Sequence, residues 1–429
     1  MANFYRFILI ALVLACAPRA SAWTHEAYVW QRQPAPAALD AAIENTRGCL
    51  DAYCFLAAEV AFDKTTGTPK ITRIPLDYAK LAAAGKPIAL AIRVGTLTIK
   101  KQFADFQPQL AALATELLAA VHAAKLEPAE LQIDFDCPES KLDLYRDWLA
   151  ALRPALGKTP LAFTALPVWL QHEDAFIALA READSFVLQV HSLEKPHGIG
   201  SFFSICEPGS ALCHATLAND LAARAGARFR IALPAYGYTL GFGADGKFVG
   251  IAAETPRDWP AGTQLRNIRS DPRAMQTLAR DLAAKKFSNA TGIIWFRLPV
   301  EGDRLVWPAV TFTAVIQNKP IVSQLVAEVR RAQPGLAEIV LINRGQTVEP
   351  LPQTVRVTWT RGVRATASDG LVGYYFYYDD DKAANTFLAL LNHTADELAP
   401  GRARVIGWIR FDFPDSETAE KFSIHADIP

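Results

Sequence analysis

The sequence predicts an α/β fold, a closed (β/α)8 barrel of the TIM type followed by a small β-rich C-terminal domain. Two observations carry this prediction. From about residue 26 onward, short apolar runs alternate with Ala- and Leu-rich helical stretches, which is typical of a parallel sheet. Eight such units lie within about 300 residues, a length that suits a closed barrel with insertions.

The N-terminus has the pattern of a secretory signal peptide. An apolar run, Phe7 to Ala17, precedes Ala20-Ser21-Ala22, a small-x-small cleavage pattern. We therefore expect residues 1–22 to be removed and the protein to be periplasmic or secreted. The alternative is a lipoprotein cut before Cys16, because residues 13–16 resemble a lipobox. No later stretch has the length and apolarity of a transmembrane segment.

Composition and cysteine spacing exclude several classes of protein. The chain is 51% hydrophobic, and Lys plus Arg equal Asp plus Glu at 44 each, so the basic excess typical of nucleic-acid binding is missing. In an oxidising compartment, Cys49–Cys54 and Cys206–Cys213 are expected to form local disulfides, which leaves Cys137 free. Zinc-type Cys and His spacings are lacking, so no metal or cofactor is expected. We expect a monomer.

The barrel is expected over residues 23–316. Its predicted strands are 26–32, 53–62, 87–95, 130–136, 160–166, 185–191, 228–236 and 291–298. The clearest predicted helices are 103–125, 141–156, 172–181, 217–225 and 272–285. The stretch 236–271 is rich in Gly and Pro and is expected to be a large loop on the active-site side.

Residues 317–429 are expected to form a sandwich-like β domain. The stretch 321–331 is predicted to be a helix or a linker, and 383–391 a short helix. The predicted strands are 338–343, 354–359, 370–378 and 404–411.

The fourth barrel strand carries the candidate catalytic residues. Alternate residues of a barrel strand point inward, and function gathers at the C-terminal ends of the strands. Because the odd-numbered residues 131–135 are apolar, Asp134 and Asp136 should face the axis. Two such carboxylates, about 6.5–7 Å apart at Cα, raise the pKa of one and allow general acid catalysis. The alternative is a structural ion pair of Asp134 with Arg93. Glu139 could also reach the site, or simply favour a helix N-terminus.

The same alternation selects candidate substrate-binding residues. On the second strand it turns Tyr53 and Phe55 inward together with Glu59. Aromatic walls and a few polar groups are what a sugar site needs. For the aromatic residues, core packing is the alternative, and His191 could instead be an acid or base. The candidates are Trp30, Glu59, Arg93, Gln189, His191, Tyr236, Trp295 and Arg297.

Three segments resemble a known family. Residues 133–139, Ile-Asp-Phe-Asp-Cys-Pro-Glu, resemble the Asp-x-x-Asp-x-Asp-x-Glu motif of the chitinase-like glycoside hydrolases of family 18. Residues 233–237 are similar to the Pro-x-Tyr-Gly on that family's seventh strand, and residues 293–295 to its last strand, whose Trp lies under the sugar. Residues 132–136 also resemble an uncharacterised bacterial barrel family with Gln-x-Asp-x-Asp on the fourth strand.

The motif departs from family 18 at two positions. The position of the chitinase acid is Pro138 here, and the position of the motif's first Asp is Leu131. The resemblance therefore implies either that Asp136 takes the place of the acid, with Asp134 as its partner, or that the chemistry is lost. It implies an exported glycoside-hydrolase-like protein acting on a polysaccharide, by a direct or a substrate-assisted mechanism.

Two alternatives remain open from the sequence. One is a non-catalytic carbohydrate-binding or envelope protein on a degenerate barrel. The other is a metal-dependent hydrolase that uses Asp134, Asp136, Glu59 and His191 as ligands.

Overall fold

The computed structural model describes residues 23–33, 35–63, 65–97, 100–254, 257–378, 386–391 and 396–429, and of residues 100–102 and 378 the backbone alone. The expected signal peptide, residues 1–22 with Cys16, lies outside the described residues. Within them, no helix is both long and apolar enough to cross a membrane.

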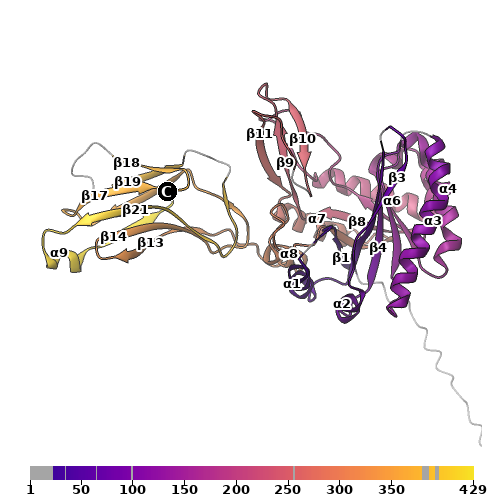
Figure 1. The fold of residues 1–429 in the computed structure, drawn as a ribbon, viewed down its shortest axis with the longest axis horizontal. Coiled ribbons are helices and arrows are strands. Elements are labelled where there is room, and N and C mark those ends of the chain that lie inside the picture. Colours follow the sequence, from indigo (N-terminus) through magenta and orange to yellow (C-terminus); the bar gives the residue numbers. More distant parts are fainter. Residues whose placement is uncertain are drawn as a thin grey trace, which may run out of the picture.

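Eight parallel strands form a closed barrel, which confirms the predicted fold class (Figure 1). Their order is β1-β12-β8-β7-β6-β5-β4-β2, and pairing of β1 with β2 closes the ring. A short strand, β3 (Pro69–Arg73), adds to β2 in antiparallel orientation. The barrel strands are β1 (Thr24–Val29), β2 (Ala52–Phe62), β4 (Ile88–Val94), β5 (Glu130–Phe135), β6 (Leu161–Ala165), β7 (Ser185–Gln189), β8 (Arg228–Pro234) and β12 (Ala290–Phe296).

Helices cover the outside of the barrel. The five helices expected from the sequence are found, and three further ones accompany them in the described part of the barrel. They are α1 (Pro36–Thr46), α2 (Tyr78–Ala83), α3 (Lys100–Ala123), α4 (Leu142–Leu156), α5 (Glu173–Arg181), α6 (Pro208–Ala225), α7 (Pro272–Ala284) and α8 (Ala309–Ile316), with the 3-10 turns η1 (Glu139–Lys141) and η2 (Pro167–Gln171).

Helix α7 shows how local sequence fixes these elements. The Asp271 side chain accepts hydrogen bonds from the backbone of Arg273 (2.7 Å) and Ala274 (3.2 Å), and Pro272 occupies the first turn, where no donor is lost. Its buried residues recur at the helical period and so form one stripe against the sheet. That stripe is Met275, Leu278, Ala279 and Leu282.

The stretch expected to be a large loop after β8 contains a three-stranded antiparallel sheet, so that expectation is wrong. We call β9 (Gly237–Phe242), β10 (Phe248–Ala252) and β11 (Gln264–Arg269) the insertion sheet. Its glycines mark close packing: a Cβ on Gly241 would lie 2.2 Å from the Trp259 ring, and one on Gly250 2.2 Å from Arg257. The insertion sheet stands off one end of the barrel (Figure 1).

The C-terminal region is β-rich, as predicted. Two four-stranded antiparallel sheets, in the orders β13-β14-β21-β17 and β18-β19-β16-β22, share one core to which Ile339 and Val357 belong. The elements are β13 (Leu325–Gln333), β14 (Leu336–Asn343), β16 (Thr354–Trp359), β17 (Arg364–Gly370), β18 (Tyr374–Tyr378), β19 (Thr386–Leu391), β21 (Ala403–Asp412) and β22 (Ile424–Asp427), with a pair β15 (Glu349–Pro350) and β20 (Glu397–Leu398) and the helix α9 (Ser416–Lys421).

Two segments of this region differ from the prediction. Most of residues 321–331, expected in a helix or linker, lie in β13, which pairs with β14 from Leu325↔Asn343 to Gln333↔Leu336. Residues 386–391, expected in a helix, form β19, where burial alternates along the strand. Cross-strand pairing on both sides of β19 outweighs the helix propensity of its Leu and Ala residues.

The C-terminal region contacts the insertion sheet directly. The Arg269 guanidinium, at the end of β11, donates to both carboxylate oxygens of Glu397 on β20, at 2.6 and 2.7 Å. Arg269 also donates to the Arg304 carbonyl oxygen at 2.7 Å. This partly buried contact joins three segments that lie far apart in the sequence.

Candidate functional site

The inward residues of three strands are those predicted from the alternation. On β4, Ala89 and Ala91 belong to the cluster inside the barrel, whereas Leu90 and Ile92 pack against the helices. On β5 and β7 the same alternation holds, with Ile133 and Leu188 outside. The prediction is confirmed for these strands, and it brings Arg93, Asp134 and Gln189 to one end of the barrel.

The alternation predicted for β2 is wrong over its first half. Tyr53 faces outward, where its hydroxyl donates to the Ile43 carbonyl of α1 at 3.2 Å, and Cys54 takes the inward position. A bulge between Leu56 and Ala58 inserts one extra residue. Because a bulge reverses the alternation, Glu59 nevertheless turns inward, in register with Arg93 on β4.

Trp295 does not face the barrel axis, which corrects the expectation that it binds substrate. It is fully buried on the helix side, and its Nε1 donates to His25 Nδ1 at 3.2 Å. The inward position belongs to Phe296, whose ring lies 5.4 Å from that of Trp30. Strand β12 is apolar on both faces, so its sequence contains no alternation from which the inward face could be read.

The two acids of β5 differ in depth. Asp134 is half-buried and accepts a hydrogen bond from the Thr164 hydroxyl at 2.8 Å. Burial, followed by repulsion from Asp136, raises the pKa of Asp134 to about 6, against the opposing effects of Arg93 and Thr164. Asp136 is more exposed; burial raises its pKa too, and Arg93 opposes this. The sequence reasoning missed Thr164, although the alternation of β6 could have found it.

A cleft of about 440 Å³ opens beside Asp136. Its walls come from the C-terminal ends of β5, β6 and β7 and from α6. The lining residues are Asp136, Leu166, Pro167, Val168, Gln171, Gln189, Ser192, Leu193 and His214.

Glu139 lies apart from this cleft. The chain turns away after β5, where the Trp169 ring donates to the Cys137 carbonyl at 3.0 Å. The Glu139 carboxylate then lies 2.8 Å from His172 Nε2, and both side chains are about half exposed. The structure therefore does not bring Glu139 together with Asp134 and Asp136.

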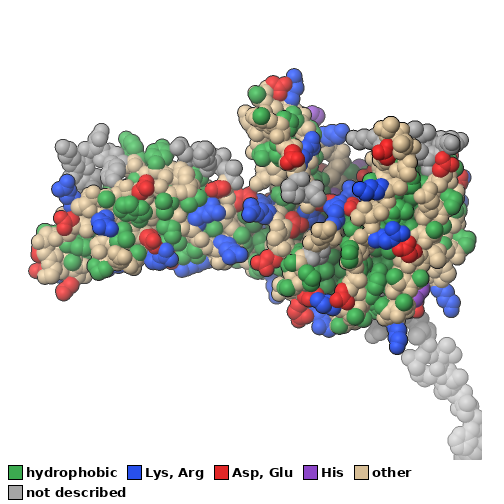
Figure 2. Space-filling view, viewed as in Figure 1, with side chains coloured by type: hydrophobic (Ala, Val, Ile, Leu, Met, Phe, Trp, Pro, Cys, Tyr) green, Lys and Arg blue, Asp and Glu red, His purple; other side chains and the backbone are tan. Residues whose placement is uncertain are grey.

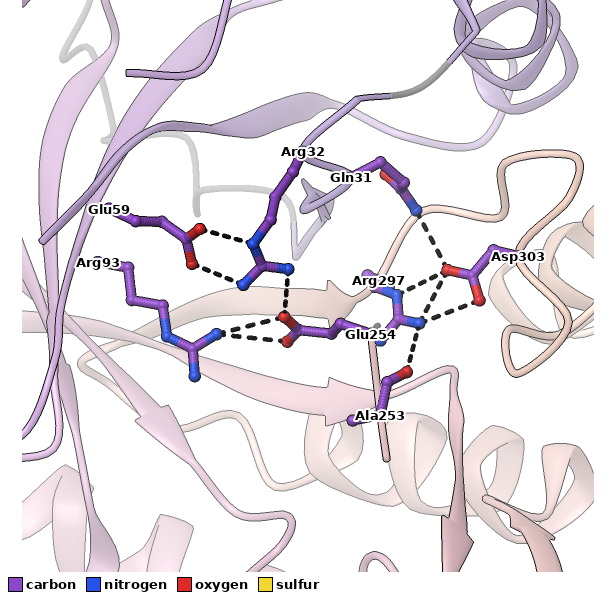
Figure 3. A network of polar contacts seen from close by, with 8 residues as sticks. All are labelled: Gln31, Arg32, Glu59, Arg93, Ala253, Glu254, Arg297 and Asp303. Atoms are coloured by element: carbon purple, nitrogen blue, oxygen red, sulfur yellow. Dashed lines mark hydrogen bonds and ion pairs between the residues drawn. The ribbon is translucent and has the colours of Figure 1, made fainter. Parts of the chain in front are cut away.

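A network of ion pairs occupies the other side of the barrel mouth (Figure 3). Arg32 donates to both oxygens of Glu59 at 2.6 Å and to Glu254 at 2.8 Å. Arg93 lies 3.4 Å from both oxygens of the same Glu254. Since Glu254 follows β10, the insertion sheet contributes a residue to the mouth that the sequence reasoning missed.

Arg297 extends this network at the end of β12. Its Nε and Nη2 donate to Asp303 at 2.8 and 3.0 Å, and Nη2 also donates to the Ala253 carbonyl at 3.0 Å. Gln31 donates to Asp303 at 3.5 Å. Arg297 is nearly inaccessible, so it braces the mouth from below rather than reaching into the cleft. In Figure 2 the surface is hollowed where the insertion sheet meets the barrel, and acidic and basic side chains both show there.

His191 and Tyr236 lie beneath Ser192 of the cleft. The Tyr236 hydroxyl is 2.5 Å from Ser192 Oγ and 3.3 Å from His191 Nδ1, and Ser192 also hydrogen-bonds Tyr238. Burial lowers the pKa of His191 to about 3, so its ring is neutral at physiological pH. Both residues thus support the floor of the cleft. Trp30, which is also buried, packs against the same Phe296 ring as His191.

The expected disulfides are not formed. In the part of the chain that the structure describes, all five cysteines carry free thiols. Cys54 points into the barrel, where its thiol contacts Gln132 at 3.1 Å, whereas Cys49 lies on the helix side against Thr46. The closed sheet thus separates the first pair. Of the second pair, Cys206 is buried in the core and Cys213 is exposed on α6.

The ligand set of the metal hypothesis is not assembled. Glu59 is held by Arg32, and His191 by Tyr236. Over residues 23–429, apart from the segments left undescribed, no three His, Cys, Asp or Glu side chains are arranged to hold a metal ion.

The fold is similar to that of several solved enzymes at low sequence identity. The spore cortex-lytic enzyme SleL of Bacillus cereus is 14% identical, over 70% of this chain and 75% of that chain, with a TM-score of 0.47. A chitinase from Chromobacterium violaceum is 14% identical, over 69% and 98%, with a TM-score of 0.48. A chitinase from Bacteroides thetaiotaomicron is 12% identical, over 66% and 92%, with a TM-score of 0.46.

Comparison with protein families gives a direct assignment, whereas no curated protein matches the chain. Residues 326–412 match a domain of unknown function, DUF8456. Residues 84–301, half of the chain, match another domain of unknown function, DUF3142. That match spans β4 to β12 and so includes both acids of β5 and the insertion sheet. The chain is therefore a member of the DUF3142 family.

Proposed function

We propose that this protein is an exported, periplasmic or secreted, glycoside-hydrolase-like enzyme that acts on a polysaccharide. One observation carries the proposal: Asp136 lines an open cleft at the C-terminal end of β5, and Asp134 lies deeper on the same strand with a pKa of about 6. This is the end of a barrel at which catalytic residues are placed.

The two acids have complementary roles. Asp136 is the general acid, which protonates the glycosidic oxygen as its bond to the anomeric carbon breaks; water bonds to that carbon and returns a proton to Asp136. Burial raises the pKa of Asp136 and so favours the protonated form that this role requires. Asp134 is the partner carboxyl, and repulsion from Asp136 raises its pKa, so the pair favours one shared proton. Arg93 and Thr164 orient and stabilise the Asp134 carboxylate.

The cleft offers both surfaces that a sugar requires. Leu166, Pro167 and Val168 form an apolar wall for the C–H face of a sugar ring. Gln189 and Ser192, which also line the cleft, offer hydrogen bonds to hydroxyl groups.

The test is hydrolysis of a panel of bacterial and plant polysaccharides, followed by the release of reducing ends. Wild-type protein should release products from at least one of them, and Asp136→Asn should lower the rate about 10²- to 10⁴-fold, the usual contribution of a general acid. Asp134→Asn should shift the pH profile as well as lower the rate. Asp220→Asn, an exposed carboxylate on α6, is the matched control. Absence of any wild-type product would reject the proposal.

A second candidate is a non-catalytic carbohydrate-binding protein. It is favoured by Pro138 at the position of the family-18 acid and by the contact of Glu139 with His172 outside the cleft. It predicts glycan binding without product release, and binding that survives both aspartate substitutions.

A further inference from the structure

The cleft and the ion-pair network occupy opposite halves of the barrel mouth. Around the ring the strands follow the order β1, β2, β4, β5, β6, β7, β8, β12. The cleft is built on β5, β6 and β7. The network is built on β12, β1, β2 and β4, from Arg297, Arg32, Glu59 and Arg93. Asp134, on β5, and Asp136, directly after it, therefore stand at the border between an open half and an occupied half.

Two successive residues of the insertion are held at the occupied half. Arg297 holds the Ala253 carbonyl at 3.0 Å, and Arg32 holds the Glu254 carboxylate at 2.8 Å (Figure 3). Glu254 is further flanked by Arg93, and its side chain is only 17% exposed. The chain from Ala253 to Glu254 is thus fixed at successive residues and forms a wall across the β12–β1 side; we call it the 253–254 wall.

A polysaccharide cleaved within its length must extend away from the catalytic acids in both directions. Here one direction follows the cleft over Leu166–Val168 toward Gln171 and His214. The other direction leads past Arg93, the register partner of Asp134, to Glu254 of the 253–254 wall. The guanidinium and carboxylate groups of the wall are paired with one another, so they present neutral, hydrogen-bonding surface rather than a charged patch.

We propose that this site takes the end of a polysaccharide chain, with the terminal sugar against the 253–254 wall and the rest of the chain in the cleft. The inference rests on the proposed function and adds its mode of action, release of short products from one end. The paired groups of the wall suit the hydroxyl groups of an uncharged terminal sugar, which can accept from guanidinium N–H groups and donate to carboxylate oxygens.

The first experiment follows products with time. The probes are eight-sugar oligosaccharides of β-1,4-linked glucose, xylose or N-acetylglucosamine, labelled at the reducing end. The corresponding soluble polymers are used for viscosity. From the outset, wild-type protein should release one short product from a single end and leave polymer viscosity almost unchanged. Internal cleavage products at the first time points, or a rapid fall in viscosity, would overturn the inference while leaving the proposed function intact.

The second experiment does not need turnover. Asp136→Asn protein is titrated with the same oligosaccharides at four and eight sugars and with the corresponding soluble polymers, by calorimetry. Binding at chain ends predicts the same number of protein molecules per chain at every length. A number that grows with chain length would reject end recognition. No binding of any probe and no cleavage by wild type would instead reject the proposed function, and this inference with it.

Glu254→Ala tests the wall itself. Loss of the contacts to Arg32 and Arg93 should free the 253–254 wall, and internal products should then appear beside terminal ones. The matched control is Asp245→Asn, in the β9–β10 turn of the same insertion, where the carboxylate pairs with Lys247; its products should equal those of wild type. End-only products from Glu254→Ala would show that this contact does not block the second direction.

Discussion

Arg93 and Asp134 are register partners on neighbouring barrel strands, β4 and β5. The guanidinium charge lowers the pKa of Asp134, while burial and the charge of Asp136 raise it more, so the pKa comes to about 6. Arg93 itself donates to Glu254. Arg93 thus lies between Asp134 and Glu254 of the insertion. The sequence had left an isolated Arg93–Asp134 ion pair as an alternative.

Asp134 should make stability depend on pH. Its pKa is about 6 in the folded protein and 3.8 without the fold, so the folded state binds the proton more tightly. The resulting stabilisation is complete below about pH 4 and is lost as pH rises through 6, about 3 kcal/mol in total. Asp134→Asn lacks this titration. The stability difference between the variant and wild type should therefore shift in favour of the variant from pH 4 to pH 7.5.

Urea unfolding at both pH values measures this change, with Asp220→Asn as the control for loss of a surface carboxylate. An equal difference between Asp134→Asn and wild type at the two pH values would mean that Asp134 titrates normally.

A buried cluster of one arginine and two glutamates lies toward the N-terminal ends of the barrel strands. Arg230 donates to Glu26 at 2.5 Å and to Glu130 at 2.5 Å, and the three side chains are 8–13% exposed. Arg230→Met would leave two carboxylates buried without a cation and should cost about 3–5 kcal/mol at pH 7. The loss should be smaller at pH 4.5, because burial raises the pKa of Glu26 and so favours its neutral form as the pH falls.

Guanidinium unfolding at the two pH values tests this cluster. Arg228→Met, exposed on the same strand, is the control and should change stability little. A loss for Arg230→Met that is the same at pH 4.5 would contradict the electrostatic explanation.

His191 should stay neutral throughout the working pH range. Its pKa is about 3 in the folded protein against 6.5 outside it, solely because of burial. The unfolded chain binds the proton first, so the stability that this residue supports is complete above pH 6.5 and declines as pH falls toward 3. Nitrogen NMR of the imidazole should show no titration above pH 4.5 in native protein. A midpoint near 6.5 would refute the buried environment.

Trp295 should matter for stability and not for sugar binding. It is enclosed by Trp307, Phe312 and His25 on the helix side. Trp295→Phe removes buried ring atoms and the donor to His25, so we expect a loss of about 1–3 kcal/mol. Thermal unfolding and calorimetric oligosaccharide binding measure the two effects separately. Weaker oligosaccharide binding at unchanged stability would mean that Trp295 contacts the sugar after all.

The sequence by itself determined the barrel and the position of its acids. Strand-helix alternation, read eight times, is enough for a parallel ring, and the polar positions of β5 break its apolar run at every second residue. The inward direction of Asp134 and Asp136 therefore follows from the residue pattern of one strand. The alternation of apolar and polar residues along a strand depends only on neighbouring residues, so the sequence of that strand contains it.

Only the tertiary structure decided the rest of the site. Glu254 reaches the mouth because the chain after β10 returns to Arg32, from which it is separated by more than two hundred residues in the sequence. Glu59 turns inward because of a bulge, and the face taken by Trp295 was not predictable because β12 is apolar on both faces. The predicted Cys49–Cys54 disulfide fails because the sheet lies between the thiols. These outcomes depend on long-range pairing and on which face a residue takes, and a local pattern records neither.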